Sequence, residues 1–163
     1  MPLVVATLQA ELIGIYEKGP TGNPSPFKVA IDTGKAYMNY VSAGMNAGGH
    51  PFIAMTAAPN LGWELADIYS KTSPSGAITA NKMAKAFDMA LASWISLFQS
   101  TIVTAPGMPG LVSGLTDIFS KPQQSSTMFA NKLAKELNTY TLAAIVSGVT
   151  PDTPGIPFTG PIS

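Results

Sequence analysis

Side chains that could carry chemistry are few in this sequence and widely separated along it. His50 is the only histidine and there is no cysteine, which excludes a histidine-cluster metal site, a thiolate metal site and cysteine–histidine catalysis. His50 corresponds to Met108 and Ile156 in two similar segments further along the chain. A position that holds His, Met or Ile is typical of packing or contact, so we do not expect proton transfer at His50.

The carboxylates and glycines give no stronger signal for catalysis. Asp67 and Asp117 occur fifty positions apart in similar surroundings, but acid–base catalysis by two carboxylates requires both of them in one cleft. We interpret these residues as separate, equivalent surface or capping groups. Gly34-Lys35 lacks the upstream glycine of a phosphate-binding loop. The sequence therefore predicts a protein that is not an enzyme and that binds no cofactor or metal.

Two lysine pairs recur in the motif Ala-Asn-Lys-x-Ala-Lys, as Lys82 with Lys85 and as Lys132 with Lys135. Lysines three residues apart lie on one helix face, where they could contact a phosphate or an acidic partner. The chain has no net charge and no arginine cluster, so the nucleic-acid signal is weak. We interpret both pairs as solvated helix faces and expect no nucleic-acid partner.

The lysine motif belongs to a longer internal similarity. Between residues 65–85 and 115–135, eleven of twenty-one residues are identical at an offset of fifty. A third, more divergent copy at the start of the chain matches the middle one at an offset of fifty-three up to Lys18, and of fifty from Ser25 onward. A fixed period of this length indicates a repeated supersecondary unit.

Each copy contains two apolar stripes with helical spacing. In the first stripe the apolar residues fall at i, i+4, i+7 and i+8, which places them on one face of a helix. We expect N-caps for these helices at Thr7 and Asn60. The second stripe extends to Phe98 in the middle copy and to Ala144 and Ile145 in the last. The first stripes are Leu8, Leu12, Ile15 and Tyr16; Leu61, Leu65, Ile68 and Tyr69; and Leu111, Leu115, Ile118 and Phe119.

These stripes predict an all-α protein of about six helices, arranged as three tandem helix–turn–helix hairpins in one domain over residues 1–150. The units span about 4–50, 57–105 and 107–149. Strand signals are weak, and the best of them, at 101–104, is brief.

The segment 150–163 contains four prolines and cannot be helical. We expect an extended C-terminal arm. Two alternatives remain open for it at this point: an unstructured end, or an arm that docks Ile156 and Phe158 onto a neighbouring subunit.

Charge is sparse and follows the repeat. Charged residues make up 11% of the chain, against roughly 25% in ordinary soluble domains. Between Lys35 and Glu64 only His50 can carry a charge near neutral pH, and between Asp88 and Asp117 no side chain can. A surface so poor in charge is weakly protected against association. We therefore expect the loops that end the copies to contact other subunits, through His50, Phe52, Met108, Pro109, Ile156, Pro157 and Phe158.

The chain resembles small virion structural proteins of tailed bacteriophages. The features that carry the resemblance are the absence of cysteine, the low charge, the Ala/Ser/Thr/Gly-rich helices, the turn Gly22-Asn-Pro-Ser-Pro26 and the ending from Pro154 to Ser163. The resemblance implies a virion location, and a structural or assembly protein that contacts itself or other structural subunits in a large assembly. The alternatives are a cytoplasmic location and a helical-repeat binding module for a peptide or an apolar ligand. Residues 89–116 form the longest uncharged interval, and because prolines interrupt it we expect no membrane-spanning segment.

Overall fold

The computed structural model describes residues 3–17, 25–52, 58–71, 75–93, 101–122 and 125–163, and six α-helices dominate these residues. The prediction of an all-α protein is confirmed in its main part. Trp94, Ile95 and Phe98, expected in a helix, lie outside the described residues. The helices are α1 (Val5–Glu17), α2 (Pro26–Ser42), α3 (Ala58–Ser70), α4 (Gly76–Ala92), α5 (Met108–Ser120) and α6 (Ser126–Leu142).

Helix length alternates along the chain. The odd-numbered helices have 13 residues each and the even-numbered ones have 17. The shorter helices begin at residues 5, 58 and 108, and the longer ones at 26, 76 and 126. These starting points are separated by the same offsets as the similar sequence segments.

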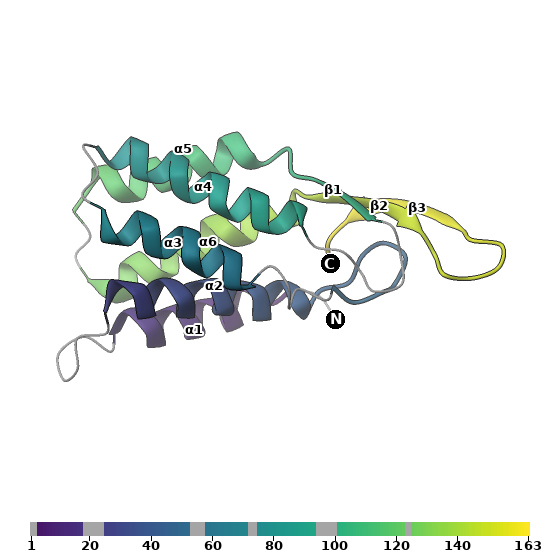
Figure 1. Ribbon diagram of the computed structural model, residues 1–163, viewed down its shortest axis with the longest axis horizontal. Coiled ribbons are helices and arrows are strands. Elements are labelled where there is room, and N and C mark those ends of the chain that lie inside the picture. Colours follow the sequence, from purple (N-terminus) through teal and green to yellow (C-terminus); the bar gives the residue numbers. More distant parts are fainter. Residues whose placement is uncertain (1–2, 18–24, 53–57, 72–74, 94–100, 123–124) are drawn as a thin grey trace.

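The six helices lie side by side along the long axis of the molecule (Figure 1). Each helix packs against the next one in the chain, and α1 packs against α6. The helices thus form a closed ring, in which each helix packs mainly against two others and turns its apolar stripe toward a shared interior.

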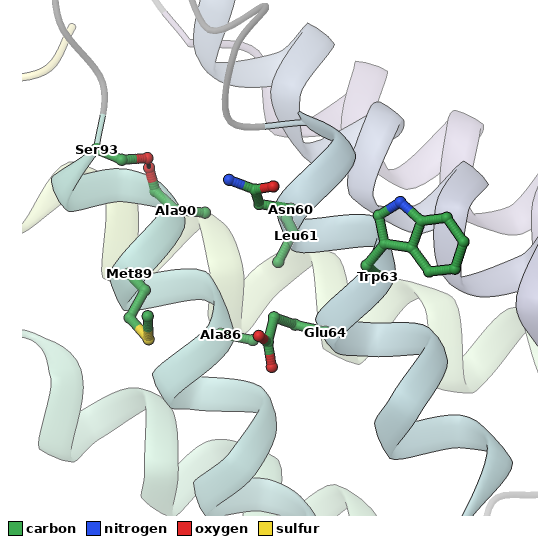
Figure 2. A pocket seen from close by; sticks show the side chains of 8 residues that line it. All are labelled: Asn60, Leu61, Trp63, Glu64, Ala86, Met89, Ala90 and Ser93. Carbon is green, nitrogen blue, oxygen red and sulfur yellow. Dashed lines mark hydrogen bonds between the residues drawn. The ribbon is translucent and has the colours of Figure 1, made fainter.

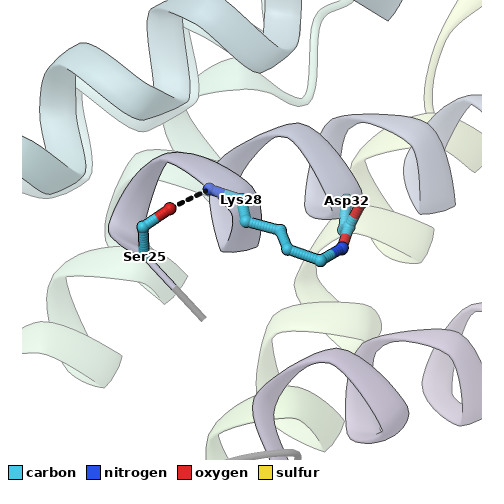
Figure 3. A network of polar contacts seen from close by, with 3 residues as sticks. All are labelled: Ser25, Lys28 and Asp32. Atoms are coloured by element: carbon cyan, nitrogen blue, oxygen red, sulfur yellow. Dashed lines mark hydrogen bonds and ion pairs between the residues drawn. The ribbon is translucent and has the colours of Figure 1, made fainter. Parts of the chain in front are cut away.

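The three longer helices begin at serine caps. The side-chain oxygens of Ser25, Ser75 and Ser125 accept hydrogen bonds from backbone N–H groups three residues further on, at 3.1–3.3 Å. In α2 the capped residue, Lys28, also pairs with Asp32 at 2.6 Å (Figure 3). The caps expected at Thr7 and Asn60 are wrong, because α1 and α3 begin two residues earlier and both residues lie within the first helical turn.

The core consists of the first apolar stripes and of small residues on the longer helices. Ala30, Ala80 and Ala130, at the same position in α2, α4 and α6, are fully buried. Small side chains at these positions let neighbouring helices approach closely. Tyr37 and Phe87 fill the space between α2 and α4, with ring centroids 4.9 Å apart in an edge-to-face arrangement. The leucines of the first stripes are at most 2% exposed, and so are three leucines of the longer helices: Leu8, Leu12, Leu61, Leu65, Leu111 and Leu115, with Leu91, Leu133 and Leu137.

A three-stranded antiparallel sheet lies at one end of the bundle (Figure 1). It consists of β1 (Thr101–Thr104), β2 (Ile145–Val149) and β3 (Pro157–Pro161), in that order. The brief strand signal at 101–104 corresponds to β1. The helical assignment of Ile145 is wrong, because α6 ends at Leu142 and the β-branched residues that follow pair as β2.

The C-terminal segment is extended, as expected, but it pairs with its own chain. In the register of β2 and β3, Ile145 faces Pro161 and Val149 faces Pro157. Beyond β3, Ser163 exchanges two backbone hydrogen bonds with Met45, at 2.7 and 3.0 Å. Residues 157–163 are therefore neither an unstructured end nor an arm docked onto a neighbouring subunit. They complete the fold of their own chain.

Ile162 anchors this segment, and it offers a direct test of the tail's role in stability. The side chain is 1% exposed, whereas Ile156 in the same segment is 60% exposed. We expect Ile162→Ala to lower the free energy of unfolding by about 2–5 kcal/mol, and Ile156→Ala to change it by less than about 0.5 kcal/mol. Urea unfolding of the two variants measures the difference. Equal effects of the two substitutions would contradict the docking of the tail.

Candidate functional site

The uncharged segments meet at the sheet end of the bundle. Helices α2, α4 and α6 run in the same direction, so their C-terminal ends lie together there (Figure 1). We call residues 43–52, 101–107 and 143–163 the uncharged end. Within it, Asp152 is the only charged side chain and His50 the only other one that ionises near neutral pH.

Loop 43–52 packs onto the sheet and supports it. The buried Asn46 side chain accepts hydrogen bonds from the backbone N–H groups of Gly48, at 3.0 Å, and His50, at 3.1 Å. Gly49 adopts a φ of 80°, which favours glycine. A Cβ at Gly48 would lie 2.9 Å from the ring of Phe158, so loop and strand are in close contact.

The structure separates the expected interface residues into exposed and inward-facing ones. Ile156, Pro157 and Pro109 are exposed. His50 and Met108 are half-buried. Phe52 is only 3% exposed, and Phe158 is half-buried against the core. Phe52 therefore belongs to the core, and Phe158 packs partly against it.

Exposed apolar residues that the sequence analysis did not single out lie on the outer side of the uncharged end. Ile145 and Val149 are 39% and 47% exposed, and the strand alternation places them on the same face of β2. Met45 in the supporting loop is 36% exposed. With Ile156, which is 60% exposed, they are the exposed large apolar side chains of the uncharged end.

Charge pairs occupy the opposite end, where the hairpin turns lie. Lys28 pairs with Asp32, and Lys71 pairs with Asp67 at 2.5 Å. Lys121 pairs with Asp117 and lowers the pKa of that carboxyl group. Asp67 and Asp117 thus lie on separate helices, each with its own lysine partner.

The two lysine pairs and Gly34, which the sequence analysis considered as possible phosphate contacts, lie on helices. Lys82, Lys85 and Lys135 are exposed and Lys132 is half-buried, on helices α4 and α6. Gly34 is buried in α2, where a Cβ would lie 3.1 Å from the backbone nitrogen of Gly62 in α3. Gly34 therefore serves close helix packing.

Tyrosine hydroxyls connect the longer helices inside the bundle. Tyr40 donates to Asn138 and Tyr140 donates to Asp88, each at 2.6 Å. Thr141 donates its only hydroxyl proton to a backbone carbonyl, so the 2.8 Å contact between Tyr37 and Thr141 has the tyrosine as donor. These three phenols act as neutral donors that hold α2, α4 and α6 together.

Burial makes these phenols harder to ionise. It raises the pKa of Tyr40 to about 12 and also raises the pKa values of Tyr37 and Tyr140 above their usual value. The hydrogen bond from Tyr140 to Asp88 raises the pKa of that phenol further, because ionisation would place a second negative charge beside the carboxylate.

The raised pKa values predict a loss of stability in alkali. Above about pH 10 the unfolded chain releases phenolic protons that the folded chain retains, so the free energy of unfolding falls as pH rises. Each buried tyrosine contributes a slope of about 1.4 kcal/mol per pH unit between about pH 10 and its folded pKa. Tyr40→Phe should make the fall shallower by about that amount, as measured by urea unfolding at a series of pH values. An unchanged slope in this variant would contradict the role assigned to Tyr40.

An exposed aromatic pair on the side of the bundle was missed from the sequence. Trp63 in α3 is 61% exposed and Phe27 in α2 is 44% exposed, and their ring centroids lie 4.9 Å apart. The available signal was the spacing of Trp63, which falls between Leu61 and Leu65 and hence off the buried stripe.

Among the described residues, three hollows border Trp63, and the smallest, of about 260 Å³, is lined by Phe27, Trp63, Ala66, Asp67 and Ser70. The two larger ones each lie between two helices. One, of about 350 Å³, lies between α3 and α4, where Glu64 and Ala86 face each other and Trp63 points away (Figure 2). The other, of about 340 Å³, lies between α2 and α3 and is lined by Phe27, Ile31, Lys35, Pro59 and Trp63.

Within the described ranges, no three His, Asp or Glu side chains lie close enough together to hold a metal ion. The same part of the chain contains no helix that is long and apolar enough to cross a bilayer. Comparison of the chain with protein-family models, with curated proteins and with solved structures gave no match.

Proposed function

We propose that this protein is a structural or assembly protein that acts through protein–protein interfaces, and that it is a virion component of a tailed bacteriophage. The observation that carries the assembly role is the concentration of exposed apolar side chains in the uncharged end. Met45, Ile145, Val149 and Ile156 are 36–60% exposed there.

The physical argument concerns desolvation. An interface that covers charged side chains must remove them from water, which costs several kcal/mol for each ion unless a partner compensates. The core of a protein–protein interface is accordingly depleted of charged residues. At the uncharged end, burial of the outer sheet face removes apolar surface from water without desolvating a charged side chain. At the other end, an interface would have to desolvate the lysine–aspartate pairs.

The assembly role is tested by introducing charge at the uncharged end. We expect the unmodified chain to associate at micromolar concentration, and the double variant Ile145→Lys with Val149→Lys to associate much more weakly. The matched control is Ile78→Lys with Met128→Lys, which adds the same charge at residues 41% and 38% exposed near the opposite end. Size-exclusion chromatography with light scattering measures the mass of each. A monomeric unmodified chain, or equal effects of the two double variants, would overturn the proposed interface.

The virion location is supported by the resemblance described above, and it has its own test. Mass spectrometry of purified phage particles from the source of the gene should detect this protein at a copy number comparable to that of other structural components. Its absence from intact particles would refute the location without affecting the measurement of self-association.

A second candidate function is a binding module for a peptide or an apolar ligand. The hollow between α2 and α3 favours it, because four of its five lining side chains are apolar. The two candidates differ in an observable way: a binding module remains monomeric with an empty groove, whereas an assembly protein associates without added ligand.

A further inference from the structure

The hollow between α2 and α3 is an apolar groove with one charge. It lies beside the close approach of the two helices at Gly34 and Gly62, where a Cβ at either glycine would lie 3.1 Å or less from the other helix. Lys35 is its only charged lining residue. Lys35 is exposed, and among the described residues it forms no salt bridge. We call this hollow, with its five lining residues, the aromatic groove.

The hairpin that connects β2 and β3 projects beyond the bundle (Figure 1). Its tip, residues 150–156, is closed by two hydrogen bonds: Thr150 N–H donates to the Ile156 carbonyl at 2.9 Å, and Ile156 N–H donates to Thr150 Oγ1 at 3.0 Å. Residues 151–156 are all exposed. The tip therefore presents Pro151, Pro154 and Ile156 together with one carboxylate, Asp152, on a loop that its own hydrogen bonds preorganise.

We propose that the tip of the β2–β3 hairpin of one copy binds in the aromatic groove of a second copy. The proposal rests on the assembly function and specifies its partner. The tip points away from its own bundle (Figure 1). The groove is lined by residues of α2 and α3 of that bundle, so the tip is free to enter the groove of another copy.

The chemistry of the two surfaces is complementary. The exposed pair of Phe27 and Trp63 offers aromatic ring surface on which the apolar side chains of the tip can pack. Asp152, the only carboxylate side chain between residues 137 and 163, carries the charge opposite to that of Lys35. One apolar anchor and one charge pair fix both the position and the direction of the inserted tip.

Because tip and groove are different surfaces, the contact is heterologous. Each copy that donates a tip still has a free groove, so binding repeats head to tail and produces a ring or an open filament. The contact is small, so each pair is weak and a larger assembly depends on many such contacts.

The test uses two defective variants of the full chain. Trp63→Ala removes the groove anchor and leaves the tip, and we expect it to weaken association at least about 30-fold. Asp152→Lys reverses the charge of the tip and leaves the groove, with an expected loss of about 5- to 10-fold. Mixed together, the variants should form a complex of one copy each, through the intact tip of the first and the intact groove of the second. Sedimentation velocity at matched concentrations measures the mixture and each variant alone.

A second experiment exchanges the charges of Lys35 and Asp152. Lys35→Glu should weaken association, and the combination of Lys35→Glu with Asp152→Lys in one chain should restore it; Lys82→Glu, at an exposed lysine on α4, is the matched control. Failure of both complementation and restoration, in a chain that still associates, would overturn the tip–groove contact alone. A monomeric unmodified chain would instead overturn the assembly function and the contact with it.

Discussion

The packing of α1 against α6 is the contact on which the rest of the structure depends. A helical hairpin with one apolar stripe cannot bury that stripe alone, and a row of three hairpins would leave an apolar face at each end of the row. Contact between the first and the last helix removes both exposed faces. Hence Leu8 and Leu12 at the start of the chain are as deeply buried as Leu65 in its middle.

Ring closure also fixes the polarity of the molecule. The longer helices run in the same direction, so the C-terminal ends of α2, α4 and α6 lie at one end of the molecule, the loop end, and their N-terminal ends lie at the other, the turn end (Figure 1). Charge follows this division: lysine–aspartate pairs stabilise the turn end, and the loop end contains Asp152 and His50 alone among its ionisable side chains. The uncharged end is therefore a consequence of topology combined with a periodic sequence.

The helices could be predicted because their signal is local, since a stripe at i, i+4, i+7 and i+8 depends on one segment only. The sheet could not, because β2 and β3 gain their hydrogen bonds from each other and from β1, more than forty residues away from β2. Phe52 and Phe158 were placed in an interface for a similar reason, because their burial against the core depends on tertiary packing. The aromatic groove is formed by side chains of both α2 and α3. The sequence around Trp63 in α3 therefore gave no indication that Phe27 of α2 lies beside it.

Close helix packing and the exposed aromatic pair have a common physical origin. Gly62 occupies the contact position on α3, where even a Cβ would lie 2.7 Å from the side chain of Ile31. The next residue points about 100° away around the helix, so Trp63 is directed to the flank of the contact, where no helix covers it. Replacing Gly62 with a larger residue would push α2 and α3 apart. The distance between Phe27 on α2 and Trp63 on α3 would then increase. The same glycine contact therefore closes the core on one side and shapes the aromatic groove on the other.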